Sequence, residues 1–590
     1  MNLDIMKMPS GHLFNYKETV QNFKHDEDIE NAPCYCQHSK FADGHHGHVV
    51  TGNLMIIENK KLRELFRKGP NYREKQTMNW GTAVRSLKED VSSFIKKWSS
   101  KVSKPVVYFS EWKYKFLKIL EQKGKLLRKK IKCRPVKKVL QDPECVKNLE
   151  ELKNKYVLVP IDKASNNIGF ICKRYFLQVL LQETHSASYN LSQDTVEEVI
   201  NDVTAKCQTI GVEVDMDNKE LPQIYATIKM HKDPVKFRFI IGSRKCVTKQ
   251  VAKKLVKILQ LIMKIHRRYC DKIKYYTGIE RYWIVDNNST VLEHINHINT
   301  KQNAKSVQTF DFSTLYTKIP LEDLKEKLKN IVDKAFKGGT NQYIKLTQQE
   351  ARWHHCKKKD TFTKEDIHNM IDIIIDNSFF RFGDKVYRQC IGIPMGIDPA
   401  PQMANLYLYY YESSFMEKLT KDNYGIAKKF NNTSRYIDDL ITLNNNGNLM
   451  NFMNTVYPQE LILNLENDND QQATFLDLDI KIQDNKFQVK TYDKRDAFNF
   501  EIVSYPDLSE NIPMQPAYGV FTSQVIRHAR ICNTQQDLAD RVQLLIKKLI
   551  KKNYTTQGIK SAIRKCFRNH QWIRQKLENP SKLLDGWSFS

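Results

Sequence analysis

Three aspartates lie at places in the sequence where packing alone gives them no role. Asp438 and Asp439 are neighbours inside the apolar, β-branched run SRYIDDLITL (434–443), and Asp311 ends the apolar run TFDF. A half-buried carboxylate is costly unless a cation or hydrogen bonds compensate its charge. A hairpin tip would explain an Asp pair by itself, but it would not explain Asp311. Three carboxylates on adjacent strand ends could hold two Mg²⁺ ions ~3.5 to 4 Å apart, which activate a hydroxyl and stabilise a leaving pyrophosphate.

The ligand type favours Mg²⁺ at this place. Oxygen-only ligation suits Mg²⁺ better than Zn²⁺, and Mn²⁺ accepts the same ligands. The sequence therefore predicts a two-Mg²⁺ site, with Mn²⁺ as an alternative ion.

Strands and helices must bring these acids together. The runs 156–171 (YVLVPIDKASNNIGFI), 236–243 (KFRFIIGS) and 306–312 are predicted strands. A helix is expected from near Pro320, where apolar residues recur every three to four places and acids occupy the first turn. Further helices are predicted at 113–131, 247–270, 365–375 and along the tyrosine-rich stretch that ends in YLYYYE. The runs TFLDLDIKI and KFQVKTYDK, separated by QDN, are typical of a β-hairpin.

Composition narrows the class of protein. The 590 residues are 41% hydrophobic, which is enough to bury the cores of several lobes. The 94 Lys and Arg exceed the 67 Asp and Glu, giving a net charge of +27. Such an excess favours a polyanionic partner, because Lys and Arg displace condensed counterions from phosphates. Ribosomal and membrane-surface proteins share this property.

Location is a weaker expectation. No apolar run reaches the ~18 to 20 residues of a membrane span, and no signal-peptide core is present, so we expect an intracellular, reducing compartment and no membrane partner. The basic clusters 123–132 and 134–138 suit a nuclear import receptor, which predicts the nucleus. They suit nucleic acid or a solvated helix face equally well.

A cysteine and histidine cluster lies near the start of the chain. It contains Cys34, Cys36, His38, His45, His46 and His48. Thiolate and imidazole are the ligands that zinc prefers. The Cys-x-Cys spacing is tighter than the usual two-residue gap, and no second cysteine pair follows, so a cluster without zinc is the alternative.

The motifs together resemble a known family. FDFSTLY, Q-x-x-GIPMG, RYIDD and FLDLDI occur in the order and approximate spacing of the reverse transcriptase palm motifs. Their wording is similar to that of Penelope-like elements, retroelements whose polymerase is nearest to telomerase. VPIDKASNNIGFI, Y-x-x-x-K-x-HK and RFIIGS are similar to the fingers of that branch, so the resemblance covers roughly residues 156 to 570.

This resemblance implies an α+β fold with the right-hand polymerase architecture of fingers, palm and thumb. The domains expected are a basic, mainly helical N-terminal extension (1–155), fingers (156–305), a palm with a primer-grip hairpin (306–503) and a helical thumb (504–590).

The resemblance also implies roles for individual residues. Asp311 and Asp438 would be direct metal ligands, and Asp439 a ligand or a close neighbour of one. Tyr316 would pack under the sugar of the incoming nucleotide and exclude a 2′-hydroxyl. Other nucleotide-binding candidates are the loop residues Gln389, Gly392, Pro394 and Gly396, and the basic residues Arg238, Lys229, Lys232 and Lys163. Candidates for primer and template binding are Tyr436, Phe475, Leu476, Asp477, Lys494, Arg527 and Arg530.

The function implied is that of an RNA-directed DNA polymerase, a nucleotidyltransferase that extends a DNA 3′ end on an RNA template with dNTPs. No GIY-YIG pair is present, so the sequence resembles a member that lacks the endonuclease; a truncated gene is the alternative. Two alternatives are a nucleic-acid-binding scaffold with an idle polymerase fold and an RNA-templated RNA polymerase. The three acids disfavour the first, and Tyr316 disfavours the second. The oligomeric state is left open.

Overall fold

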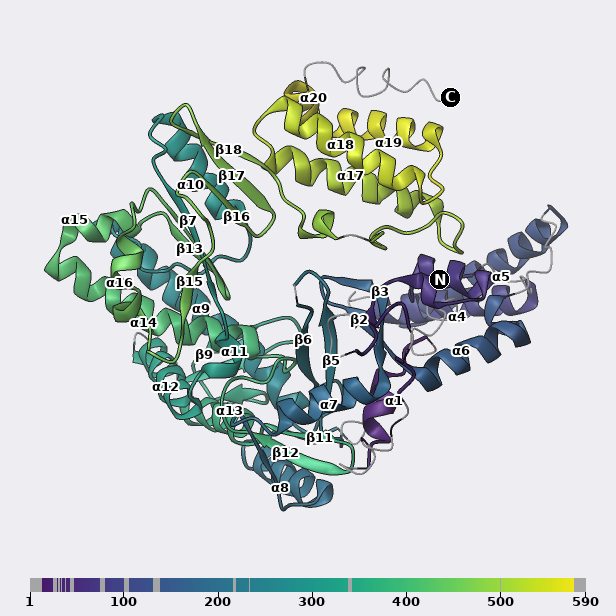
Figure 1. Ribbon diagram of the computed structural model, residues 1–590, viewed down its shortest axis with the longest axis horizontal. Helices are drawn as coiled ribbons and strands as arrows, with labels where there is room; N and C mark the ends of the chain where they lie inside the picture. Colours follow the sequence, from purple (N-terminus) through teal and green to yellow (C-terminus); the bar gives the residue numbers. More distant parts are fainter. Residues whose placement is uncertain are drawn as a thin grey trace.

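The computed structural model describes residues 13–577 except 25–28, 30, 31, 33, 38, 43–46, 75–79, 100–105, 131–137, 216–218, 233, 338–341 and 499. Helices and sheets are mixed along the chain, which agrees with the expected α+β class. In Figure 1 a four-stranded sheet and its helices lie at the left, a larger sheet lies at the centre, and a C-terminal helical bundle lies at the top.

The largest sheet has eight strands, in the order β1-β3-β2-β5-β11-β12-β4 with β6 paired to β5. Its strands are β1 (Val50–Thr51), β2 (Tyr156–Ile161), β3 (Ala164–Cys172), β4 (Tyr189–Leu191), β5 (Gln223–Lys229), β6 (Lys236–Gly242), β11 (Phe379–Phe382) and β12 (Lys385–Gln389). Helices α1 (Tyr16–Gln21) and α7 (Lys173–Thr184) pack against it, and α8 (Val196–Thr209) contacts α13 (Lys364–Asp376). This sheet therefore contains strands from three of the domains expected from the sequence: the N-terminal extension, the fingers and the palm.

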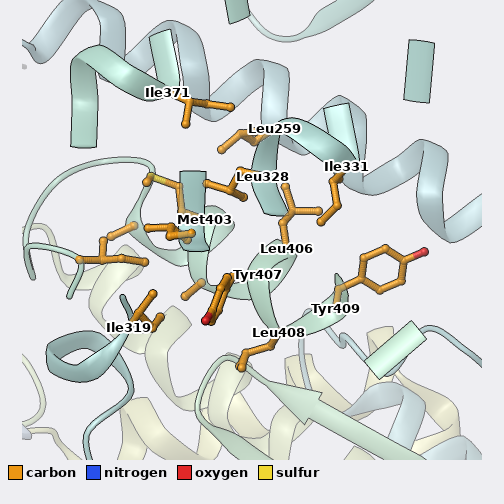
Figure 2. Close-up of a cluster of buried hydrophobic side chains, with 14 of the residues drawn as sticks. Leu259, Ile319, Leu328, Ile331, Ile371, Met403, Leu406, Tyr407, Leu408 and Tyr409 are labelled. Carbon is orange, nitrogen blue, oxygen red and sulfur yellow. The ribbon is translucent and has the colours of Figure 1, made fainter. Parts of the chain in front are cut away.

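The four-stranded sheet has the order β13-β14-β7-β15. Its strands are β7 (Val307–Phe312), β13 (Thr433–Tyr436), β14 (Asp439–Leu443) and β15 (Leu463–Leu465). The helices that share its hydrophobic core are α9 (Lys249–Thr277), α12 (Leu321–Lys337), α13 and α14 (Ala400–Asp422), with α16 (Asn448–Val456) beside α14. Figure 2 shows Leu259 of α9, Leu328 of α12 and Leu406 of α14 meeting in this core. The apolar periodicity of α9 and α12 is thus explained, because each buries one face, whereas α14 buries every residue from Met403 to Tyr409.

A three-stranded sheet, β16-β17-β18, contains the predicted hairpin. Its strands are β16 (Gln472–Phe475), β17 (Leu478–Gln483) and β18 (Lys486–Thr491). The hairpin of β17 and β18 is confirmed, with Asp484 and Asn485 at φ 51° and 56° in the turn. Reading TFLDLDIKI as one strand was wrong, because the chain reverses at Leu476 and Asp477, and Phe475 pairs with Leu478.

The remaining described elements cover the ends and the connections. The N-terminal helices α3 (Lys60–Lys68), α4 (Trp80–Ser99), α5 (Val106–Lys130) and α6 (Pro143–Lys155) include the helix predicted at 113–131. The C-terminal bundle contains α17 (Met514–Ile531), α18 (Gln535–Ile550), α19 (Thr556–Asn569) and α20 (Gln571–Lys576), which share a core of their own. A fourth sheet, β10-β8-β9, has strands β8 (Tyr343–Leu346), β9 (Ala351–His354) and β10 (Thr361–Phe362). Short helices are α10 (Ser289–Thr300), α11 (Leu315–Lys318) and α15 (Tyr424–Ala427), and 3-10 turns lie at Leu54–Ile56, Val139–Gln141, Lys428–Phe430 and Lys494–Ala497.

Within the described residues, none of the helices combines the length and the apolar character that crossing a membrane requires. The basic residues 134–137 of the second predicted import cluster lie outside the described residues.

Candidate active site

The three aspartates singled out in the sequence meet at one end of β7 and β14, the two inner strands of the four-stranded sheet. Strand β14 runs antiparallel to β7, and Asp439 pairs directly with Asp311. Residues opposite each other in an antiparallel pair project from the same face with Cβ atoms about 4.5–5.5 Å apart. Asp438 immediately precedes β14, and its charge acts on both of the other carboxyls. Acids that are far apart in the sequence therefore share one small volume.

The turn that carries Asp438 has an unusual backbone. Tyr436 pairs with Asp439, so Ile437 and Asp438 form a two-residue hairpin turn. Ile437 has φ 56°, which is a strained conformation for a β-branched residue. Such strain costs of order 1–3 kcal/mol and persists only where the surroundings impose it.

Arg435 and Glu412 supply these surroundings. Both side chains are fully buried and form a two-pronged ion pair. Nη1 of Arg435 also donates to the Ile437 carbonyl at 2.9 Å and to Asn405 Oδ1 at 2.8 Å. The Tyr457 hydroxyl donates to Glu412 Oε1 at 2.9 Å. A buried ion pair thus fixes the peptide group next to Asp438 from beneath.

Sequence reasoning missed this pair. Arg435 is a charged residue within the strand of the opening motif, and Glu412 ends the tyrosine-rich stretch of α14. The available signal was a charged residue in each of two otherwise apolar or aromatic stretches.

The electrostatics show that the acids repel one another. Burial first, and then the charge of Asp438, raises the pKa of both Asp311 and Asp439 from 3.8 to about 6. Glu466, which follows β15, adds to both shifts, whereas Lys494 opposes both and Lys232 opposes that of Asp311. Glu466 was also missed by the sequence reasoning. An all-oxygen set of crowded carboxylates is the donor set that suits a hard divalent cation such as Mg²⁺.

This crowding predicts a pH-dependent response to metal. Because the folded pKa of about 6 exceeds the unfolded value of 3.8, the metal-free protein loses stability as pH rises through about 6. Bound Mn²⁺ should restore that stability only where the carboxyls are ionised. We expect Mn²⁺ to raise the melting temperature at about pH 8 and to have little effect at about pH 5.

The measurement is thermal unfolding with and without Mn²⁺ at each pH, so that other titrating groups cancel in the difference. An equal Mn²⁺ effect at both pH values, or the same effect in Asp311→Asn, would contradict the expectation.

The GIPMG loop joins the two main sheets. Gly392 has φ 84°, a Cβ there would clash with the Tyr316 carbonyl, and that carbonyl accepts the Ile393 N–H at 2.7 Å. Gly396 has φ 125° and packs as closely on the Ile241 carbonyl of β6. Only glycine fits either position, so the loop holds β6 at a fixed distance from the turn after Asp311.

Three other predicted nucleotide-binding residues, Pro394, Gln389 and Tyr316, lie in or next to this loop and are partly or fully buried. Pro394 is buried within the loop. Gln389 is 2% exposed, and its Nε2 donates to the Ile391 carbonyl at 2.9 Å. The Gln389 side chain therefore supports the loop from inside. Tyr316 is half-buried, and burial and the charge of Asp438 both raise its pKa.

The predicted nucleotide-binding cations belong to the larger sheet: Lys229 and Arg238 lie in strands β5 and β6, and Lys163 and Lys232 lie between strands. Arg238 of β6 forms an ion pair of 3.0 Å with Asp162, a partner that the sequence reasoning missed. Lys229 ends β5, and burial and the Arg238 charge lower its pKa. Lys163 is exposed, at φ 63° in the turn between β2 and β3.

A cavity of about 650 Å³ lies beside the acids. It is lined by Asp439 and by the predicted residues Lys163, Tyr436, Leu476, Asp477, Lys494, Arg527 and Arg530. Phe475 is 2% exposed and belongs to the core beneath the cavity. Leu476 has φ 52°, so the turn at Leu476 and Asp477 repeats the apolar-Asp arrangement of Ile437 and Asp438.

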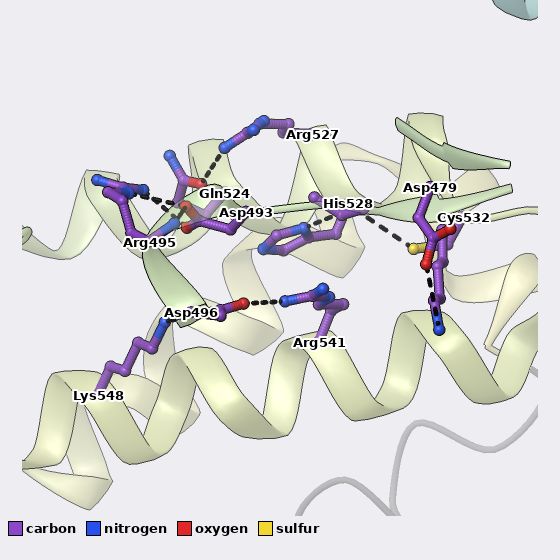
Figure 3. A network of polar contacts seen from close by, with 12 residues as sticks. Asp479, Asp493, Arg495, Asp496, Gln524, Arg527, His528, Cys532, Arg541 and Lys548 are labelled. Atoms are coloured by element: carbon purple, nitrogen blue, oxygen red, sulfur yellow. Dashed lines mark hydrogen bonds and ion pairs between the residues drawn. The ribbon is translucent and has the colours of Figure 1, made fainter. Parts of the chain in front are cut away.

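The C-terminal bundle is attached next to this cavity. Arg527 of α17 forms an ion pair of 2.9 Å with Asp477. Arg541 and Lys548 of α18 reach Asp496 at 2.7 and 2.8 Å (Figure 3). The bundle is thus held by charged contacts to the turn between β16 and β17 and to the segment that follows β18.

No protein-family model matches the chain, and no curated protein sequence matches it. The structure is similar to solved telomerases. A Candida albicans telomerase in complex with a TWJ fragment of telomeric RNA has a TM-score of 0.46 and 11% identity, with 81% of this chain and 69% of that chain covered. A Candida tropicalis telomerase in complex with a TWJ fragment of telomeric RNA has a TM-score of 0.43 and 12% identity, with 91% of this chain and 78% of that chain covered. An apo Candida tropicalis telomerase truncated from its C-terminal domain has a TM-score of 0.41 and 12% identity, with 75% of this chain and 77% of that chain covered. Because these TM-scores lie below 0.5, the functional proposal depends on the residues of the site.

Proposed function

We propose that this chain is an RNA-directed DNA polymerase of the Penelope-like kind that extends a DNA 3′ end on an RNA template. The observation that carries the proposal is the register of β7 and β14, which pairs Asp311 with Asp439 beside Asp438. Carboxylates placed in this way suit two Mg²⁺ ions, which would activate the primer hydroxyl and stabilise the leaving pyrophosphate.

The surrounding residues suit the other parts of this reaction. Lys163 and Lys232 present positive charge to the phosphates of the incoming dNTP, and Arg238, held by Asp162, suits phosphate oxygens with its planar fork. The Tyr316 ring, next to Asp438, is suited to lie under the sugar. Across the cavity, Lys494, Arg527 and Arg530 are suited to the primer and template backbones.

We assign the parts of the right hand accordingly. The eight-stranded sheet would form the fingers, the four-stranded sheet and its helices the palm, β16–β18 the primer grip, and the C-terminal bundle the thumb. The excess charge of +27 supports nucleic-acid partners. Action in the nucleus on an existing DNA 3′ end is part of the proposal.

Primer extension by the purified full chain on an RNA template tests the proposal. We expect extension with dNTPs and Mg²⁺, and none with rNTPs or with EDTA. Extension with rNTPs would favour an RNA polymerase. RNA binding without extension under any metal condition would favour an idle scaffold.

Tyr316→Ala tests the assignment of the sugar contact. Removing the ring should let ribonucleotides enter, lowering the discrimination between dNTPs and rNTPs by about 10- to 100-fold. Steady-state kcat/KM for each nucleotide measures it, with Tyr410→Ala of α14 as a control for loss of a half-buried ring. Unchanged discrimination in Tyr316→Ala would remove the sugar-gate role.

A further inference from the structure

A second group of metal-ligand side chains lies far along the chain from the acids. The ligand atoms of Cys34, Cys36, His48 and Cys172 all lie within 4.8 Å of one another. Three of these residues belong to the cluster noted in the sequence, whereas Cys172 ends strand β3 of the eight-stranded sheet. His38, His45 and His46 lie outside the described residues.

The distances from Cys34 to Cys172 and to His48 match those between tetrahedral zinc ligands. With Zn–S bonds of about 2.3 Å and Zn–N bonds of about 2.0–2.1 Å, tetrahedral ligands lie about 3.8 Å apart for two sulfurs and about 3.5–3.6 Å apart for sulfur and nitrogen. Cys34 Sγ lies 3.8 Å from Cys172 Sγ and 3.5 Å from His48 Nδ1. The two sulfurs are therefore spaced as zinc ligands are, and well beyond the length of a disulfide bond.

Contacts within the protein hold Cys36, His48 and Cys172 in place. The Val49 N–H donates to Cys36 Sγ at 3.2 Å, and the Cys172 N–H donates to the Val49 carbonyl at 2.8 Å. The His48 ring stacks on the Tyr175 ring, with centroids 5.2 Å apart and planes at 16°. Hydrogen bonds to ligand atoms and a fixed imidazole are the outer contacts expected of a metal site.

We propose that Cys34, Cys36, His48 and Cys172 bind one structural Zn²⁺ ion that fastens the N-terminal segment to the eight-stranded sheet. A site with four protein ligands leaves no open position for substrate, which is the arrangement of structural zinc. Cys172, from strand β3, supplies the fourth ligand beside Cys34, Cys36 and His48. The ion would reinforce the short pairing of β1 with β3, where Val50 faces Ile171. This inference does not depend on the polymerase function.

Zinc content and cobalt absorption of the full chain test the proposal. We expect about one zinc per purified chain by mass spectrometry, and Co²⁺ in its place should give the visible absorption of tetrahedral thiolate ligation. Cys34→Ser and Cys172→Ser should each lose the zinc. Cys34 is exposed, so its variant should fold even where the buried Cys172→Ser does not. Cys566→Ser, buried in the C-terminal bundle, is the matched control and should keep the zinc.

Three results would overturn the proposal. The first is a zinc-free wild-type protein that does not take up Co²⁺ with tetrahedral absorption. The second is zinc retained in full by Cys34→Ser. The third is a disulfide among the three cysteines in place of the ion, seen as two fewer free thiols.

Discussion

Asp438→Asn is expected to abolish primer extension, by about 10³-fold or more, while the fold and RNA binding stay nearly unchanged. Asparagine has the size of aspartate and is tolerated in turns, so the hairpin of β13 and β14 should keep its shape. The substitution removes one of the negative charges that the proposed Mg²⁺ ions require. Loss of several kcal/mol of charge stabilisation gives the expected factor.

Single-turnover extension on an RNA template measures this effect, and an RNA-binding titration runs beside it. Asp468→Asn, at an exposed position before β16, is the matched control and should extend normally. Near-normal extension by Asp438→Asn would contradict the metal role.

Arg435→Leu is expected to lower the free energy of unfolding by about 3–5 kcal/mol, because it leaves the buried Glu412 without its cation. It also removes the donor to the Ile437 carbonyl and so frees the strained turn. Denaturant unfolding of the variant measures the loss of stability. A loss below about 1 kcal/mol would show that the pair is not buried as described.

A double variant separates the two effects. Arg435→Leu with Glu412→Leu removes both charges and should recover much of the stability, since apolar replacement of a buried ion pair is often neutral. Primer extension should nevertheless stay about 10- to 100-fold low, because the Ile437 carbonyl still lacks its donor. Recovery of both stability and extension in the double variant would mean that Arg435 does not position Asp438.

Local patterns in the sequence predicted the helices α5, α9, α12, α13 and α14 and several strands correctly. Helices α9 and α12 follow from apolar periodicity, and the hairpin of β17 and β18 follows from its turn residues. Both signals depend on residues that are close together in the sequence. Local patterns also placed Asp311 at the end of a strand, whereas the hairpin tip, considered only as an alternative for the Asp pair, is where Asp438 lies.

Contacts between distant segments could not be predicted in the same way. The pairing of Asp311 with Asp439 depends on the register of two strands separated by several helices. The Arg435–Glu412 pair and the approach of Cys172 to Cys34 exist only after α14 and β3 are packed. No period or turn signal in the sequence encodes such a contact, so the meeting of the acids was predicted only from the cost of leaving their charges uncompensated and from the resemblance to a family.

The same reason explains the strands that sequence reasoning missed. Strands β11 and β12 leave the segment assigned to the palm and pair with β5 and β4. The sequence of a short hairpin does not indicate which sheet it joins, because its pairing partners depend on tertiary packing. Glu466 was missed likewise, since only the pairing of β15 with β7 brings it near Asp311.

The most direct test of the central claim is anomalous X-ray scattering from Mn²⁺ in crystals of the full chain with an RNA template, a primer and a non-hydrolysable dNTP. The account predicts two Mn²⁺ peaks about 3.5–4 Å apart, bound by the carboxylates of Asp311 and Asp438. Clear density for the nucleotide with no Mn²⁺ between these two carboxylates would contradict it.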